Sequence, residues 1–202
     1  MPRPELAAEN KLKFQAKIEC FSLKSRKNSF NQKNPYFYSL TFFEMTPNEN
    51  IIIKFYTAFG NSDAAQMCEC YHPDVQFRDP AFGLLKGDEV CQMWKMLIER
   101  SKGNLKIDFS EVEADERNGS ARWIATYNFS QTNRKVVNTI AAKFFFQDGL
   151  IIKHTDDFDI WKWSQQALGF KGLLMGWTGF FQDKIQKKAR LALKKYGEKK
   201  DK

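Results

Sequence analysis

A carboxylate stands at the end of a predicted strand inside the segment Tyr71–Gly83, which reads YHPDVQFRDPAFG. Apolar and polar residues alternate over 75–78, the period-two pattern of a short strand, and Asp79 follows where this strand stops. Pro80 restricts Asp79 to an extended backbone and excludes it from a helix. A carboxylate fixed at the rim of an apolar strand, with phenylalanines on both sides, is a candidate general base. The simpler interpretation is an Asp-Pro turn, which is common.

The elements that would position Asp79 can be predicted from hydrophobic periodicity. Residues 45–49, MTPNE, form a capping box with proline in the first turn, and an apolar helical face follows over 51–59. A second helix begins at Asp63 and a third covers about 88–102. Four strands are expected at about 105–114, 120–131, 134–147 and 150–160, with a hairpin turn at Asn118-Gly119. This order predicts an α+β fold: a cone-shaped barrel in which a curved antiparallel sheet wraps around a helix layer.

Each of the long strands has an apolar face. In the last strand His154, Asp156 and Phe158 share one face, and a register shift of one residue would instead turn Asp157 inward. The two preceding strands carry mostly apolar residues at alternate positions over 121–129 and 138–146. A concave apolar face with a few polar groups is typical of a small-molecule pocket.

The charge of the chain lies in its tails. The 202 residues carry a net charge of +8, but residues 45–183 hold 15 Lys or Arg and 18 Asp or Glu. A nucleic-acid-binding domain should carry its basic patch on the folded body, so we expect no nucleic-acid partner. The chain divides into a poorly ordered extension at 1–44, an α+β domain at 45–163, and a helical extension with a basic tail at 164–202. The extension at 1–44 is either an over-extended reading frame, with Met45 as the true initiator, or a targeting or regulatory arm.

The cysteines are interpreted as free thiols. Cys68 and Cys70 are one residue apart on a predicted helix and point to different faces, which suits neither a disulfide nor a zinc knuckle. Free thiols indicate a reducing compartment. Neither a spanning apolar stretch nor a secretory signal is recognised, and we therefore expect a cytoplasmic protein. The sequence contains no metal-ligand spacing, phosphate loop or dinucleotide fingerprint, and we expect no cofactor and no metal.

The chain resembles a known family over residues 46–196. The motifs that carry the resemblance are FYTAF at 55–59, YHPD at 71–74, FRDP at 77–80, Met93-Trp94, and DGLI at 148–151 with the segment through Trp161. They are similar to the SnoaL-like, ketosteroid-isomerase-like branch of the nuclear transport factor 2-like superfamily. The resemblance implies a cone-shaped α+β barrel, often dimeric, with a ligand cavity between helices and sheet. It is specific for the fold and says little about the reaction.

The resemblance also assigns roles residue by residue. Asp79 matches the catalytic base of the isomerase, but the two oxyanion donors are replaced by Phe55 and Ala142, which argues against steroid isomerisation. His154 and Asp156 match inward positions of the last strand, where SnoaL-like cyclases hold an acid/base carboxylate. We therefore take Asp79, His154 and Asp156 as the catalytic candidates, although His154 can equally be a hydrogen-bonded core histidine. The ligand-binding candidates are Tyr56, Phe59, Phe77, Phe82, Trp94, Trp123, Tyr127, Ala142, Phe144 and Phe158.

The C-terminal extension combines an apolar, glycine-rich segment at 169–181 with a basic amphipathic helix at 183–196. It can cap the open end of the cone or pack on a partner subunit, and this is the favoured interpretation. It can also lie on an anionic membrane surface.

Three classes of function remain open. The first is a cofactor-independent isomerase, cyclase, lyase or hydratase that acts on a small, mostly apolar molecule. The second is a binding module without chemistry, and the loss of both isomerase donors favours it. A homodimer is a further expectation, and a membrane or assembly role through the extension is the third hypothesis.

Overall fold

The computed structural model describes residues 45–200, with Lys200 described by its backbone only. The predicted N-terminal extension at 1–44 lies outside the described residues, as does Cys20. The elements in chain order are α2 (Pro47–Gly60), α3 (Ala64–Glu69), β1 (Tyr71–Asp79), β2 (Gly83–Lys86), α4 (Asp88–Ser101), β3 (Lys106–Ala114), β4 (Asn118–Phe129), β5 (Arg134–Gln147), β6 (Leu150–Asp157), α5 (Ile160–Leu168), α6 (Phe170–Met175) and α7 (Gly179–Lys200).

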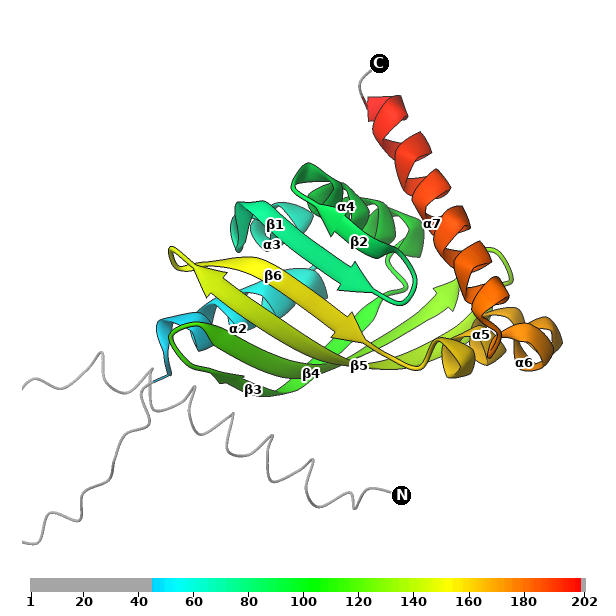
Figure 1. Cartoon of the computed structure of the whole chain (residues 1–202), viewed down its shortest axis with the longest axis horizontal. Coiled ribbons are helices and arrows are strands. Elements are labelled where there is room, and N and C mark those ends of the chain that lie inside the picture. Colours follow the sequence, from blue (N-terminus) through cyan, green and yellow to red (C-terminus); the bar gives the residue numbers. More distant parts are fainter. Residues whose placement is uncertain (1–44, 201–202) are drawn as a thin grey trace, which may run out of the picture. The chain divides into compact units, whose positions relative to one another are not determined.

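One curved six-stranded sheet organises the domain, with strand order β2-β1-β6-β5-β4-β3 (Figure 1). Strands β3 to β6 form the antiparallel meander that the sequence predicts. Strand β1 joins β6 in parallel, and β2 pairs antiparallel with β1 at the edge. The sheet is curved and unclosed, and it carries helices and a C-terminal helix, which confirms the α+β prediction.

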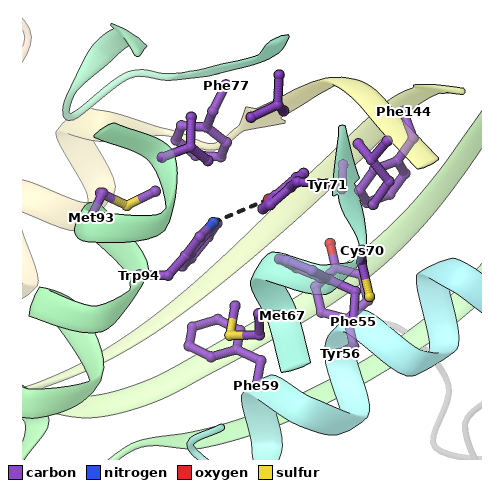
Figure 2. Close-up of a cluster of buried hydrophobic side chains, with 14 of the residues drawn as sticks. Phe55, Tyr56, Phe59, Met67, Cys70, Tyr71, Phe77, Met93, Trp94 and Phe144 are labelled. Atoms are coloured by element: carbon purple, nitrogen blue, oxygen red, sulfur yellow. Dashed lines mark hydrogen bonds between the residues drawn. The ribbon is translucent and has the colours of Figure 1, made fainter. Parts of the chain in front are cut away.

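Helix α2 forms where the sequence predicts it. The Thr46 hydroxyl accepts a hydrogen bond from the backbone N–H of Glu49, and the Glu49 carboxylate accepts one from the backbone N–H of Thr46, so two otherwise unpaired donors are satisfied. The apolar face of α2 packs on β3 and β4. Figure 2 shows Phe55, Tyr56 and Phe59 of this face gathered with Met93 and Trp94 of α4 and Tyr71 of β1.

The inner face of the sheet follows strict alternation in β5. Every second residue is buried, from Val136 through Asn138, Ile140, Ala142, Phe144 to Phe146. Strand β6 continues the pattern: His154 and Asp156 are buried whereas Asp157 is exposed. The alternative register with Asp157 inward is therefore wrong.

The C-terminal extension is part of the same packed unit. Helix α5 packs on β5, where the side-chain amide of Gln166 bonds both the N–H and the C=O of Val137 at 2.8 and 3.1 Å. Helix α6 packs on α5, and the long helix α7 packs on α4 (Figure 1). Arg190 of α7 donates to the carbonyl oxygens of Phe82 and Leu84, which ties α7 to the β1–β2 hairpin.

The free-thiol interpretation is wrong for two cysteines. Cys68 of α3 and Cys91 of α4 form a disulfide across a Cα–Cα distance of 5.6 Å, because the packing of these two helices brings the residues together. Cys70 is free and buried. The spacing argument excluded a Cys68–Cys70 pair correctly, but it did not consider a partner on another helix.

Candidate functional site

A cavity of about 990 Å³ lies between α4, the inner face of the sheet and the segment from α5 to α7. Its size suits a small organic molecule. The wall is mostly apolar, with few polar groups in its interior. The interior wall includes Phe59, Phe77, Phe82, Met93, Trp94, Met96, Trp123, Ala125, Tyr127, Ile140 and Trp163, with Asp79, Asn138 and Asp156 as its polar members.

Asp79 lies on this wall at the end of β1. Pro80 ends the strand, and the chain turns back so that the backbone N–H of Phe82 donates to Oδ1 of Asp79. Burial raises the pKa of the Asp79 carboxyl from an ordinary value of 3.8 to about 7. The charge of Asp156 adds to the increase, while backbone N–H donors from Ala81, Phe82 and Gly83 oppose it. A carboxyl group with a pKa near neutrality can both accept and return a proton at physiological pH.

Asp156 lies on the same wall and is fixed by two side chains. Its Oδ1 accepts from Nε1 of Trp123 at 3.2 Å and from Nε2 of His154 at 3.0 Å. Nδ1 of His154 in turn bonds the Tyr71 hydroxyl at 2.7 Å. Nε1 of Trp94 donates to the same hydroxyl at 3.1 Å, the hydrogen bond drawn in Figure 2. The result is a buried chain that runs from Trp94 through Tyr71 and His154 to Asp156.

Chemistry defines two of the donors in this chain. The indole N–H of Trp94 can only donate, so the Tyr71 oxygen accepts from it. Oδ1 of Asp156 accepts from Nε2 of His154, and the hydrogen bond between Nδ1 of His154 and the Tyr71 hydroxyl completes the chain. His154 does not line the cavity, so it orients Asp156 from behind and does not reach a ligand.

Tyr127 also lines the cavity and adds a phenol to its wall. Tyr127 accepts a hydrogen bond from Nε1 of Trp163 at 2.8 Å, which leaves the Tyr127 hydroxyl proton available to another acceptor. Burial raises the pKa of Tyr127, the hydrogen bond from Trp163 opposes this increase, and the charge of Asp79 adds to it. Tyr127 therefore stays protonated at neutral pH and can act as a hydrogen-bond donor inside the cavity.

Most of the residues predicted to bind a ligand do line the cavity. They are Phe59, Phe77, Phe82, Trp94, Trp123, Tyr127 and Phe158, together with the predicted carboxylates Asp79 and Asp156. Tyr56, Ala142 and Phe144 do not line it. Tyr56 is stacked on Phe109 at a ring-centroid distance of 5.4 Å, and Phe144 packs on His154 at 4.4 Å, so these side chains belong to the core beneath the cavity.

Some wall residues were missed by sequence reasoning. Asn138 is a polar residue at an inward position of an otherwise apolar strand, and this signal was available in the β5 alternation. Ile185, Ala189 and Ala192 of α7 form an apolar stripe that the sequence also reveals. The sequence does not reveal that this stripe faces the cavity, because its orientation depends on how α7 packs. The contribution of Trp163 depends in the same way on how α5 packs.

Residues 45–200 were compared with the requirements of a metal site and of a membrane-spanning helix. No group of three or more His, Cys, Asp or Glu side chains gathers there in a way that could hold a metal ion. Nor is any helix in this part of the chain both long enough and apolar enough to span a bilayer.

The comparisons with known proteins fit this geometry. The SnoaL-like domain model matches residues 52–154. Bal32a, from a soil-derived mobile gene cassette, is 17% identical with a TM-score of 0.54, covering 60% of this chain and 96% of its own. An NTF2-like protein from Burkholderia pseudomallei K96243 is 16% identical with a TM-score of 0.52, and the match covers 61% of this chain and 98% of that protein. A candidate polyketide cyclase from Xanthomonas campestris pv. campestris is 16% identical with a TM-score of 0.50, and the match covers 60% of this chain and 96% of that protein. No match was found among curated proteins.

Proposed function

Because this chain belongs to the SnoaL-like domain family, we propose that its cavity binds a small, mostly apolar molecule and that Asp79 acts on this molecule as a general base. The reaction class is a cofactor-independent isomerisation, cyclisation, elimination or hydration. The observation that carries the proposal is Asp79 itself: a carboxyl group on the wall of an apolar cavity whose pKa is raised by burial to about 7. The likeness in fold to a candidate polyketide cyclase supports the same class.

The proposed chemistry is a proton transfer. The Asp79 carboxylate removes a proton from an activated C–H of the ligand, and the electron pair of that bond moves onto an adjacent carbonyl oxygen. Asp79, now a carboxylic acid, returns the proton at another atom, so that no external oxidant, reductant or cofactor is needed. The hydroxyl of Tyr127 is available to donate to the developing oxyanion, since its oxygen already accepts from Trp163.

Tyr127 would replace the two oxyanion donors that the isomerase has and this chain lacks. Phe55 and Ala142 stand at those positions, and both side chains are buried in the core. Tyr127 comes from β4, so the donor would reach the ligand from a different strand than in the isomerase. Asp156 would add a second carboxylate, held in one orientation by His154 and Trp123.

A second candidate function is ligand binding without turnover. The loss of both isomerase donors favours it, because the cavity remains equally suited to an apolar ligand when no oxyanion is stabilised. The two functions differ in what Asp79 does: a base is needed for turnover, whereas a binding module needs only a polar contact at that position.

Native mass spectrometry of the full chain, expressed in its own host, separates these functions. The comparison uses the wild type, Asp79→Asn and Asp157→Asn, because Asp157 lies on the exposed face of the same sheet and serves as the matched control. We expect the wild type and Asp157→Asn to retain the same small apolar molecule, and Asp79→Asn to retain a different, unconverted one. The same retained molecule in all three proteins would favour the binding module. Empty cavities throughout would contradict both functions.

A further inference from the structure

The segment that closes the cavity carries an exposed apolar surface. We call Phe170, Leu173, Leu174, Trp177 and Phe180 the outer patch; they come from α6, the turn between α6 and α7, and the start of α7. Phe170 and Phe180 are more than 70% exposed, and Trp177 is 66% exposed. Isolated exposed apolar residues are ordinary, but these five and the exposed Met175 make six large ones within eleven residues, which indicates a binding surface.

The outer patch is displayed on a tightly packed base. A Cβ at Gly172 would lie 1.9 Å from the backbone oxygen of Ser164, and one at Gly176 would lie equally close to the Ser164 hydroxyl. These two glycines therefore allow α6 to approach α5 closely. The indole N–H of Trp161 also donates to the carbonyl of Leu173 at 3.2 Å. The apolar side chains are thus presented outward by a fixed backbone.

The charge around the outer patch is predominantly positive. Residues 160–197 contain eight Lys or Arg and a single acid, Asp183. Lys162, Lys171, Lys184, Lys187 and Lys188 are all exposed and flank the patch in sequence. A second copy of this chain placed patch to patch would bring two strongly basic surfaces together, which opposes self-association through this face.

The outer patch is continuous with the mouth of the cavity. Phe170 and Met175 are exposed and also line the cavity, so apolar surface extends from outside the molecule to its interior. Lys171, Lys184 and Lys188 lie on the cavity wall at the same end. Figure 1 places α6 and the first turns of α7 beside one end of β4 and β5, and all four elements contribute residues to the cavity wall.

We propose that this face docks on an anionic membrane surface and brings the mouth of the cavity against the bilayer. Aromatic and aliphatic side chains would enter the boundary between headgroups and acyl chains, while the lysines contact anionic headgroups. An apolar ligand then passes between bilayer and cavity without crossing water. This transfer step rests on the ligand-binding function proposed above, whereas the docking step does not.

The test is flotation of the full chain with vesicles of phosphatidylcholine alone and with 30% phosphatidylglycerol. We expect the wild type to float with the anionic vesicles and to be released by high salt, because the lysine contacts are screened. The patch variant Leu174→Ser/Trp177→Ser/Phe180→Ser, whose residues do not line the cavity, should lose at least tenfold in partitioning.

The matched control is Leu84→Ser/Val137→Ser/Phe145→Ser, which removes three exposed apolar residues outside the outer patch and should float like the wild type. Circular dichroism checks that each variant is folded. Docking is contradicted if the wild type fails to float, or if the patch variant and the control float equally. Light scattering that reveals a dimer abolished only in the patch variant would assign this face to a second copy and also overturn the proposal. Neither result bears on the molecule retained in native mass spectrometry.

Discussion

At the scale of single residues, the cavity holds two carboxylates in different surroundings. Asp79 accepts hydrogen bonds from backbone N–H groups at a turn, whereas Asp156 accepts from the side chains of His154 and Trp123. An arrangement in which neighbouring titratable groups have different environments is a common basis for dividing acid and base roles. The raised pKa of Asp79 also makes the free energy of unfolding depend on pH, which can be measured.

Asp79→Asn should stabilise the protein at high pH. The pKa of the Asp79 carboxyl is 3.8 in the unfolded chain and about 7 in the folded one, so the folded chain binds more protons between these two pH values. The free energy of unfolding therefore falls as pH rises through this window, and below it the difference disappears. Asparagine has no such charge to bury. We expect a gain of roughly 1–3 kcal/mol at pH 8, less than the full shift because the cavity can admit water, and no gain at pH 4.

Chemical unfolding at several pH values measures this gain. Asp157→Asn, on the exposed face of β6, should follow the wild type throughout. If Asp79→Asn and the wild type differ in stability by the same amount at pH 4 and pH 8, the pKa of Asp79 is not raised in the folded protein.

Two buried tyrosines allow a matched comparison. The Tyr71 hydroxyl bonds both His154 and Trp94, whereas the Tyr56 hydroxyl is buried and has no hydrogen-bond partner among the described residues. Tyr71→Phe leaves two buried groups unpaired and should cost about 1–3 kcal/mol of unfolding free energy. Tyr56→Phe removes only an unsatisfied group and should be neutral or stabilising. Urea unfolding of both variants checks this, and equal losses would contradict the hydrogen-bonded chain.

At the scale of elements, the disulfide joins α3 to α4 across 23 residues. Chain entropy for a loop of this length predicts a contribution of about 3 kcal/mol. A reductant such as dithiothreitol should therefore lower the unfolding temperature of the wild type. It should leave that of Cys91→Ala, which starts lower, unchanged. A reductant effect that persists in the variant would mean that another thiol pair is responsible.

The elements also show where sequence patterns suffice. Capping residues and periodicity predicted α2, α4 and the meander to within a few residues. The first hairpin was displaced: the turn lies at 115–117, where Asp115 accepts from the N–H groups of Arg117 and Asn118. Gly119 lies inside β4 instead, at a position where a Cβ would approach the side chain of Ile52 to 2.8 Å. Close approach to a distant residue leaves no local sequence signal.

The candidate site follows the same division. Alternation along β6 was enough to turn His154 and Asp156 inward, but it could not tell that Asp156 reaches the cavity while His154 lies behind it. Periodicity likewise could not tell that Tyr56 faces the core, because helix α2 supplies residues both to the cavity wall and to the layer beneath it. The short strand β2 and the parallel pairing of β1 with β6 depend on contacts between distant segments, which one sequence does not reveal.

At the scale of the whole described domain, the packing of α7 determines whether the cavity is closed on the side that α7 lines. Leu193 is 4% exposed and belongs to the main core, whereas Leu191 on the same helix is 53% exposed. Leu193→Ala should cost about 2–4 kcal/mol of unfolding free energy, and Leu191→Ala should stay within about 0.5 kcal/mol of the wild type. Urea unfolding measures both. Equal effects would mean that α7 does not pack on the domain in solution, and the cavity would then be an open cleft whose wall and membrane-facing mouth both need another explanation.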